Sequence, residues 1–247
     1  MKSSNRESFL WTFYDNLSMT ETIQEVEEAI ENKRQIHHIV INAGKIVSMH
    51  KNKELRKSVN NADIINIDGQ AVKWAAQFLG KPVKERVAGV DLFEKLLEFA
   101  HQNKYKVFLL GATDEVVNKV AEKISQNYDE KVIAGIQNGY FKKEEEALIV
   151  SKINETQPQM LFVAISSPKK ELFLDKYKYN LKDVNFIMGV GGSFDVYSGL
   201  IKRAPVWMQR YGLEWFYRFL QEPKRMWKRY LVGNTKFIYF VLREKFK

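Results

Sequence analysis

The chain has 247 residues, of which 45% are hydrophobic, and it contains no cysteine. This length and apolar content exclude a disordered protein and suffice for one large α/β domain, or for one domain with an appendage. The absence of cysteine excludes disulfides, thiolate metal sites and cysteine nucleophiles. The sequence also lacks a secretory-signal pattern and an apolar run long enough to cross a bilayer, so we expect a cytoplasmic protein.

The net charge of +9 is concentrated at one end of the chain. Residues 201–247 contain twelve lysine and arginine residues against three glutamates, whereas residues 1–200 sum to zero. This asymmetry indicates an anionic partner for the C-terminal segment: a nucleic acid, a phosphate-bearing substrate or an acidic membrane surface.

Apolar runs that alternate with helical patterns predict a parallel sheet. The predicted strands are residues 36–42, 64–67, 106–110, 132–136, 160–165 and 186–190. The alternation favours an α/β fold, a Rossmann-like and mostly parallel sheet flanked by helices and joined by right-handed crossovers. We expect residues 1–200 to form this catalytic core and residues 201–247 to form a basic, aromatic, helical appendage.

Polar residues stand where several of these strands end. Asp68 ends the second strand as Asn42 ends the first, and Arg86 lies in a loop after helix 70–78. The carboxyl ends of parallel strands border the ligand crevice, so Asp68 is a candidate base. An aspartate before Gly69 is equally typical of a helix cap or an Asx turn, and both interpretations stay open.

The other strand exits are small or polar, and free backbone N–H groups there suit a phosphate or diphosphate. The candidate binding residues are Gly111, Asn138, Gly139, Tyr140, Ser167, Lys170, Gly191 and Asp195. The glycines of residues 189–192 do not complete G-x-G-x-x-G, and no Walker A sequence occurs, so a nicotinamide or flavin enzyme is disfavoured.

We expect neither a metal nor a cofactor. The sequence has no Asp-x-Asp pair, and the adjacent His37 and His38 point to opposite faces of a strand. The charge of a diphosphate would then be met by helix N-termini and by arginine or lysine.

The C-terminal segment combines positive charge with aromatic residues. Trp207, Tyr211, Trp215 and Phe219 recur every four residues, which predicts an aromatic stripe on a helix. A further helix is predicted from Pro223 to Gly233, followed by an apolar segment, residues 237–242, of interfacial character. Packing of the stripe on the core and contact with a membrane both remain open. The candidate cations for a leaving diphosphate are Arg86 and Lys170 together with Arg218, Arg225 and Lys228 or Arg229 of this segment.

Several short segments together carry a family resemblance. They are Ala62-Asp63, Asp68-Gly69, Trp74-Ala75-Ala76, Leu79-Gly80-Lys81-Pro82, Glu85-Arg86-Val87-Ala88-Gly89-Val90-Asp91-Leu92, Asn138-Gly139-Tyr140-Phe141, Ser167-Pro168-Lys169, Gly189-Val190-Gly191, Arg203-Ala204-Pro205, Gly212-Leu213-Glu214-Trp215, Gln221-Glu222-Pro223 and Arg229-Tyr230-Leu231. In this order and spacing, over about residues 20–245, the chain resembles the WecG/TagA/CpsF family of bacterial glycosyltransferases, glycosyltransferase family 26.

The resemblance implies an inverting, metal-independent transferase. Such an enzyme moves a sugar of the N-acetylmannosamine type, or a related hexose, from a UDP-sugar donor to an undecaprenyl-diphosphate-linked acceptor, in cell-surface polysaccharide or teichoic acid biosynthesis. It implies Asp68 as the base and Asn42 and Arg86 as polar site residues. It also implies an appendage that completes the site on the anionic inner face of the cell membrane. Val40 and Lys170 depart from the family pattern, which leaves the donor sugar open.

Two other classes remain as alternatives: another nucleotide-sugar enzyme and a basic nucleic-acid-binding protein. A nucleic-acid partner would leave the neutral α/β body without a role, so we expect none. A homo-oligomer is compatible with the sequence.

Overall fold

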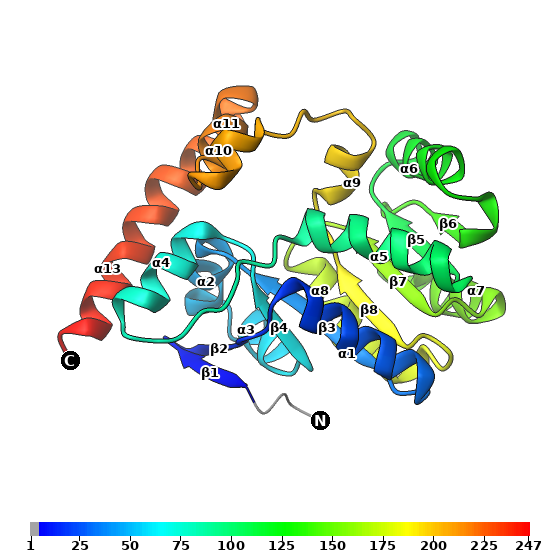
Figure 1. Cartoon of the computed structure of the whole chain (residues 1–247), viewed down its shortest axis with the longest axis horizontal. Helices are drawn as coiled ribbons and strands as arrows, with labels where there is room; N and C mark the ends of the chain where they lie inside the picture. Colours follow the sequence, from blue (N-terminus) through cyan, green and yellow to red (C-terminus); the bar gives the residue numbers. More distant parts are fainter. Residues whose placement is uncertain (1–4) are drawn as a thin grey trace.

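The computed structural model describes residues 5–247, apart from the side chains of Arg225, Lys228 and Arg229. Its centre is a six-stranded sheet in the order β4-β3-β8-β7-β5-β6, parallel throughout (Figure 1). The strands are β3 (Ile36–Ile41), β4 (Ile64–Ile67), β5 (Val107–Gly111), β6 (Ile133–Gln137), β7 (Met160–Ala164) and β8 (Phe186–Gly189). The predicted α/β fold and its six strands are therefore confirmed.

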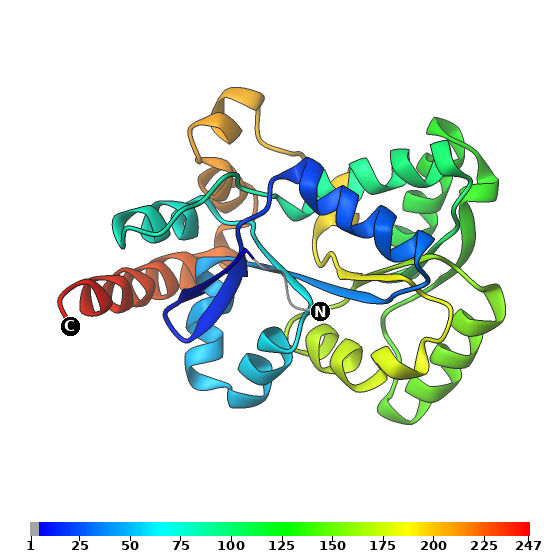
Figure 2. The same cartoon turned by 60° about the horizontal axis from the view of Figure 1, so that its bottom comes forward.

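Helices cover both faces of this sheet (Figure 2). One face carries α1 (Met19–Glu31), α5 (Gly89–Asn103) and α6 (Asp114–Asn127), and the other carries α2 (Ala43–Lys51), α3 (Lys53–Asn60), α7 (Glu146–Thr156) and α8 (Lys169–Tyr177). Successive strand residues point to opposite faces, so Phe162 packs with the α5 side and Leu161 with the α7 and α8 side. Burial on both faces explains why these strands are continuous apolar runs. Shorter elements are α4 (Gln70–Phe78), η1 (Glu130–Val132), η2 (Lys143–Glu145), η3 (Lys178–Asn180) and α9 (Ser193–Tyr197).

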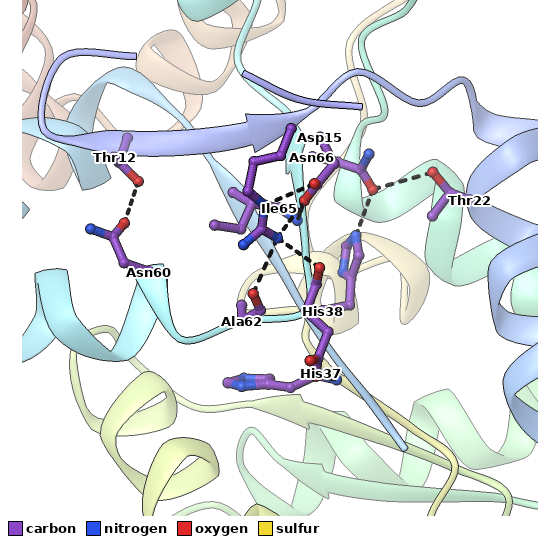
Figure 3. A network of polar contacts seen from close by, with 11 residues as sticks. Thr12, Asp15, Thr22, His37, His38, Asn60, Ala62, Ile65 and Asn66 are labelled. Carbon is purple, nitrogen blue, oxygen red and sulfur yellow. Dashed lines mark hydrogen bonds and ion pairs between the residues drawn. The ribbon is translucent and has the colours of Figure 1, made fainter. Parts of the chain in front are cut away.

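A hairpin of β1 (Arg6–Phe9) and β2 (Thr12–Asp15), which the sequence did not predict, lies beside the edge strand β4. The buried Asp15 carboxylate accepts hydrogen bonds from Arg6 Nε at 2.9 Å and Nη2 at 2.8 Å, and from the backbone N–H of Ile65 at 2.7 Å (Figure 3). Ile65 belongs to β4, so the carboxylate satisfies an edge N–H that another chain could otherwise pair with.

A second buried polar group lies between β3, β4 and α1. The Asn66 side-chain oxygen accepts from Thr22 Oγ1 at 3.3 Å and contacts His38 Nε2 at 2.7 Å, which favours the neutral His38 tautomer protonated on Nε2 (Figure 3). Burial lowers the pKa of His38 to about 4 and that of its neighbour His37 to about 3. Both histidines are therefore neutral core residues at physiological pH.

The C-terminal segment is helical, with boundaries that differ from the predicted ones. Its elements are α10 (Val206–Arg210), α11 (Glu214–Gln221), α12 (Pro223–Trp227), a π-helical turn η4 (Lys228–Val232) and α13 (Gly233–Lys245). The predicted single stripe was wrong: Gly212, at φ +71°, separates Trp207 on α10 from Trp215 on α11.

The predicted helix end at Gly233 was also wrong, because the helical segment continues to Lys245. Phe237 and Val241 of α13 are buried in one cluster with Phe9 of the hairpin and with residues of α2, and this packing outweighs the low helix propensity of glycine. Within residues 5–247, none of the helices combines the length and apolarity that a membrane span requires.

Candidate active site

The exits of β3 and β4 touch each other at the carboxyl edge of the sheet. Asn42 follows β3 and caps α2, its side-chain oxygen accepting from the backbone N–H of Lys45 at 3.0 Å. Asp68 and Gly69 follow β4. A Cβ on Gly69 would lie 3.0 Å from Asn42 Cβ, so the absence of a side chain lets the two exits meet.

Asp68 reaches across this edge to the start of α5. Its Oδ1 accepts the backbone N–H of Gly89 at 3.1 Å. A Cβ on Gly89 would lie 3.6 Å from Val40 of β3 and 3.7 Å from Met188 of β8, which places this contact above the two strands. The N-cap of α4 is Gly69 and has no side-chain hydrogen bond, so Asp68 is not the cap of the helix that directly follows it.

Arg86 lies beside Asp68 and connects it to the C-terminal segment. Its Nη1 is 3.3 Å from the Asp68 carbonyl oxygen and 3.4 Å from Glu214 Oε2 of α11. The other Glu214 oxygen accepts from Arg203 Nε at 3.2 Å. The sequence did not single out Glu214, whose two arginine partners lie far from each other in sequence.

Two predicted cations lie against the loop that follows β8. A Cβ on Gly189 would lie 3.0 Å from Lys170 Cδ, and one on Gly191 would lie 3.4 Å from Lys170 Nζ. A Cβ on Gly192 would lie 2.7 Å from Arg218 Nη2. The glycines therefore leave room for an ammonium from α8 and a guanidinium from α11 at one strand exit.

A buried ion cluster that the sequence did not predict supports Lys170. Glu171 Oε1 lies 2.9 Å from Lys45 Nζ of α2 and 3.2 Å from Lys170 Nζ. Burial alone would raise the pKa of Glu171, but the two ammonium groups, together with hydrogen bonds from Lys45 and Ser167, lower it to about 2. Lys45 could have been noticed in the sequence, because it lies three residues after the candidate Asn42, in the first turn of the helix that follows.

Four other predicted residues gather at the exits of β5 and β6. Gly111 has φ +101°, and a Cβ there would lie 2.6 Å from the Ala164 carbonyl oxygen, so only glycine fits. Gly139 packs on Gly111, Asn138 Nδ2 donates to Asp114 at 3.0 Å, and Tyr140 is exposed.

The predicted residues thus form two groups. The first, at the exits of β3, β4 and β8, contains Asn42, Asp68, Arg86, Lys170, Gly191 and Arg218. The second, at the exits of β5 and β6, contains Gly111, Asn138, Gly139 and Tyr140.

Ser167 helps to lower the pKa of the Glu171 carboxyl and so belongs with the ion cluster of the first group. Asp195 lies on α9, where its carbonyl oxygen accepts from Ile201 N–H at 3.0 Å. The side chains of Arg225, Lys228 and Arg229 lie outside the described part of the chain. In that part, no three His, Asp or Glu side chains are grouped as metal ligands would be.

Comparison with known proteins assigns the family. The sequence model of the "Glycosyl transferase WecG/TagA/CpsF family" matches residues 8–247. An N-acetylglucosaminyldiphosphoundecaprenol N-acetyl-beta-D-mannosaminyltransferase of Bacillus spizizenii (strain ATCC 23059 / NRRL B-14472 / W23) is 38% identical over 187 residues, 76% of this chain and 71% of that protein. A protein of the same name from Bacillus subtilis (strain 168) is 37% identical over 195 residues, 79% of this chain and 74% of that protein. The chain therefore belongs to the WecG/TagA/CpsF family of glycosyl transferases.

Proposed function

We propose that this glycosyltransferase moves a hexose, of the N-acetylmannosamine type or related to it, from a UDP-sugar to a sugar linked to a polyprenyl diphosphate. The names of both Bacillus relatives support a polyprenyl-diphosphate-linked acceptor and an N-acetylmannosaminyl group as the transferred sugar. The observation that carries the mechanism is the Asp68 carboxylate, held by the Gly89 N–H at the carboxyl edge of the sheet with Arg86 beside it.

The reaction we propose is a single displacement with inversion. Asp68 takes the proton of the acceptor hydroxyl as its oxygen bonds to the anomeric carbon, while the bond from that carbon to the UDP oxygen breaks. A base placed in this way contributes roughly 10²–10⁴-fold to the rate. Asp68 uses Oδ1 to bind Gly89, which fixes the carboxylate and leaves Oδ2 to face the acceptor.

The negative charge that develops on the departing UDP needs a cationic environment. Arg86 lies in the loop before α5, Lys170 on α8 and Arg218 on α11, and all three contact the exits of β4 and β8. Lys45 adds a fourth positive charge, which Glu171 holds beside Lys170. We propose that these groups bind the diphosphate, a role that requires no divalent ion.

We further propose that the protein binds peripherally to the inner face of the cell membrane through residues 201–247. The segment carries the whole net charge of the chain, and Trp207, Tyr211 and Trp227 are exposed on it. Basic residues beside exposed aromatic residues favour an anionic lipid interface. This binding would hold the candidate active site at the membrane, within reach of an acceptor that is anchored in the bilayer.

An assay of UDP release tests the proposal. The purified protein is incubated with UDP-N-acetylmannosamine, with and without a short-chain polyprenyl-diphosphate-N-acetylglucosamine, and both UDP and the disaccharide product are measured. We expect both products to depend on the acceptor. UDP release without an acceptor would indicate another nucleotide-sugar reaction, and no turnover of any UDP-hexose tested would contradict the proposal.

A further inference from the structure

The helix α4, directly after the candidate base, is apolar on two faces. Val72, Ala75 and Ala76 point into the core. On the opposite side Trp74 is 53% exposed and Phe78 is 48% exposed, and Lys73 is the one charged residue of the helix. A surface helix normally presents a polar second face to water, so the outer face of α4 has the character of a contact surface.

The C-terminal segment contacts α4 at both of its ends (Figure 1). At the first end, a Cβ on Gly212 would lie 2.5 Å from Gln70 Cγ and 3.2 Å from Trp74 Cη2, so the turn between α10 and α11 rests directly on α4. At the other end, Lys245 Nζ of α13 lies 5.3 Å from the centre of the Phe78 ring. The outer face of α4 is therefore continuous with the surface of the C-terminal segment.

The neighbours of α4 on this surface are apolar and basic. Tyr211, next to Gly212, is exposed, and so are Leu242 and Phe246 on either side of Lys245. Aromatic rings beside ammonium groups match an anionic bilayer, in which the rings enter the interface and the cations meet the lipid phosphates. The net charge of +9 on residues 201–247 provides the complementary charge.

We propose that α4 is a second membrane-contact element, and that Trp74 and Phe78 enter the interface of an anionic bilayer together with the C-terminal segment. This inference rests on the proposed peripheral binding and extends it from the segment to the α/β body. Asp68 precedes the first residue of α4, Gln70, by two positions, and Trp74 lies about 6 Å along the helix axis from Gln70. The bilayer contact thereby sets the height of the base above the lipid.

The test uses the full chain and vesicles of phosphatidylglycerol and phosphatidylcholine. Trp74→Ser, Phe78→Ser and the double variant are compared with wild type by co-sedimentation. We expect each single variant to weaken vesicle binding several-fold and the double variant to weaken it at least tenfold. UDP release with a water-soluble acceptor and the thermal unfolding midpoint should stay near wild type.

Tyr179→Ser is the matched control. Tyr179 is 84% exposed in η3, which precedes β8 and so lies at the amino end of the sheet, opposite the candidate site. We expect this variant to bind vesicles as wild type does. A second readout uses a chain in which Trp74 is the sole tryptophan, the other four being replaced by phenylalanine. Its fluorescence should be quenched by brominated lipid.

The outcomes separate this inference from the proposed function. If the α4 variants bind vesicles as wild type does and Trp74 is not quenched, the inference is wrong. Peripheral binding through residues 201–247 would then still be supported if charge reversal in that segment abolished vesicle binding. If wild type binds no anionic vesicles, both are wrong. If Trp74→Ser abolishes self-association in solution and leaves vesicle binding intact, α4 is instead a contact between copies of this chain, and the inference is overturned.

Discussion

The Asp68 side chain accepts a hydrogen bond from the Gly89 N–H, and this determines what a conservative substitution does. In Asp68→Asn the amide oxygen still accepts the Gly89 N–H, but the side chain no longer takes a proton. We expect turnover to fall by at least about 100-fold with the thermal unfolding midpoint nearly unchanged. Steady-state UDP release and differential scanning calorimetry measure the two quantities.

Asp129→Asn is a suitable control for this prediction. Asp129 also accepts a backbone N–H, that of Lys131 at 2.8 Å, but it precedes β6 and lies at the amino end of the sheet. Its replacement should leave turnover unchanged. An Asp68→Asn enzyme that retains most of its activity would reduce Asp68 to a structural role at the start of α5.

Glu171 gives the stability of the protein a dependence on acid pH. Its folded pKa is about 2, below the ordinary value of 4.5. The stabilisation from its ion pairs is therefore complete above about pH 4.5 and is lost as the pH falls toward 2, where the folded protein also binds the proton. Replacement by Gln leaves Lys45 and Lys170 buried without their carboxylate, which we expect to cost about 3–5 kcal/mol at pH 7.

Urea unfolding of wild type and Glu171→Gln at pH 7, 4 and 3 measures this effect. The difference between the two free energies of unfolding should shrink as the pH falls. Glu115→Gln, which removes a solvent-exposed pair with Lys119, is the control and should change stability little at any pH. An equal difference at all three pH values would contradict the lowered pKa of Glu171 in the folded protein.

At the scale of elements, α11 brings a guanidinium to the exit of β8. If Arg218 binds the departing diphosphate, Arg218→Glu should lower turnover even with a water-soluble acceptor, because the defect lies in the chemical step and not in membrane binding. Arg243→Glu makes the same charge reversal at an exposed position of α13. Its turnover with the water-soluble acceptor should equal that of wild type. Equal turnover of the two variants with the soluble acceptor would restrict Arg218 to a surface role.

The sheet could be predicted because each of its strands is a local apolar run bounded by turn residues, as in residues 160–165. The hairpin could not be predicted, because Arg6 and Asp15 hydrogen-bond Asp63 and Ile65, at least fifty residues later in the chain. Asp68 and Asn42 could be found because each directly follows a predicted strand. The pair of Lys45 and Glu171 could not, because it joins two helices that are distant in sequence. The helical segment continues from η4 across Gly233 into α13 because Phe237 packs in the core, which no local sequence pattern shows.

At the scale of the whole molecule, the proposed chemistry depends on side-chain cations. Activity should therefore survive an excess of EDTA, because Arg86, Lys170 and Arg218 meet the charge of the diphosphate without a divalent ion. UDP release is measured before and after chelation, and with Mg²⁺ or Mn²⁺ added back. Activity that is lost on chelation and restored by either ion would refute metal independence.

The order of the strands also has a consequence for the synthesis of the chain. The strand β8 is the last of the sheet in sequence, yet it lies between β3 and β7 and is the sole link between the β4-β3 pair and the β7-β5-β6 group in the described sheet. The sheet cannot close until residue 189 of 247 has left the ribosome. Nascent chains shorter than this hold two separate strand groups, which have unpaired strand edges and exposed apolar surface. Such chains are targets for chaperones and incapable of sugar transfer.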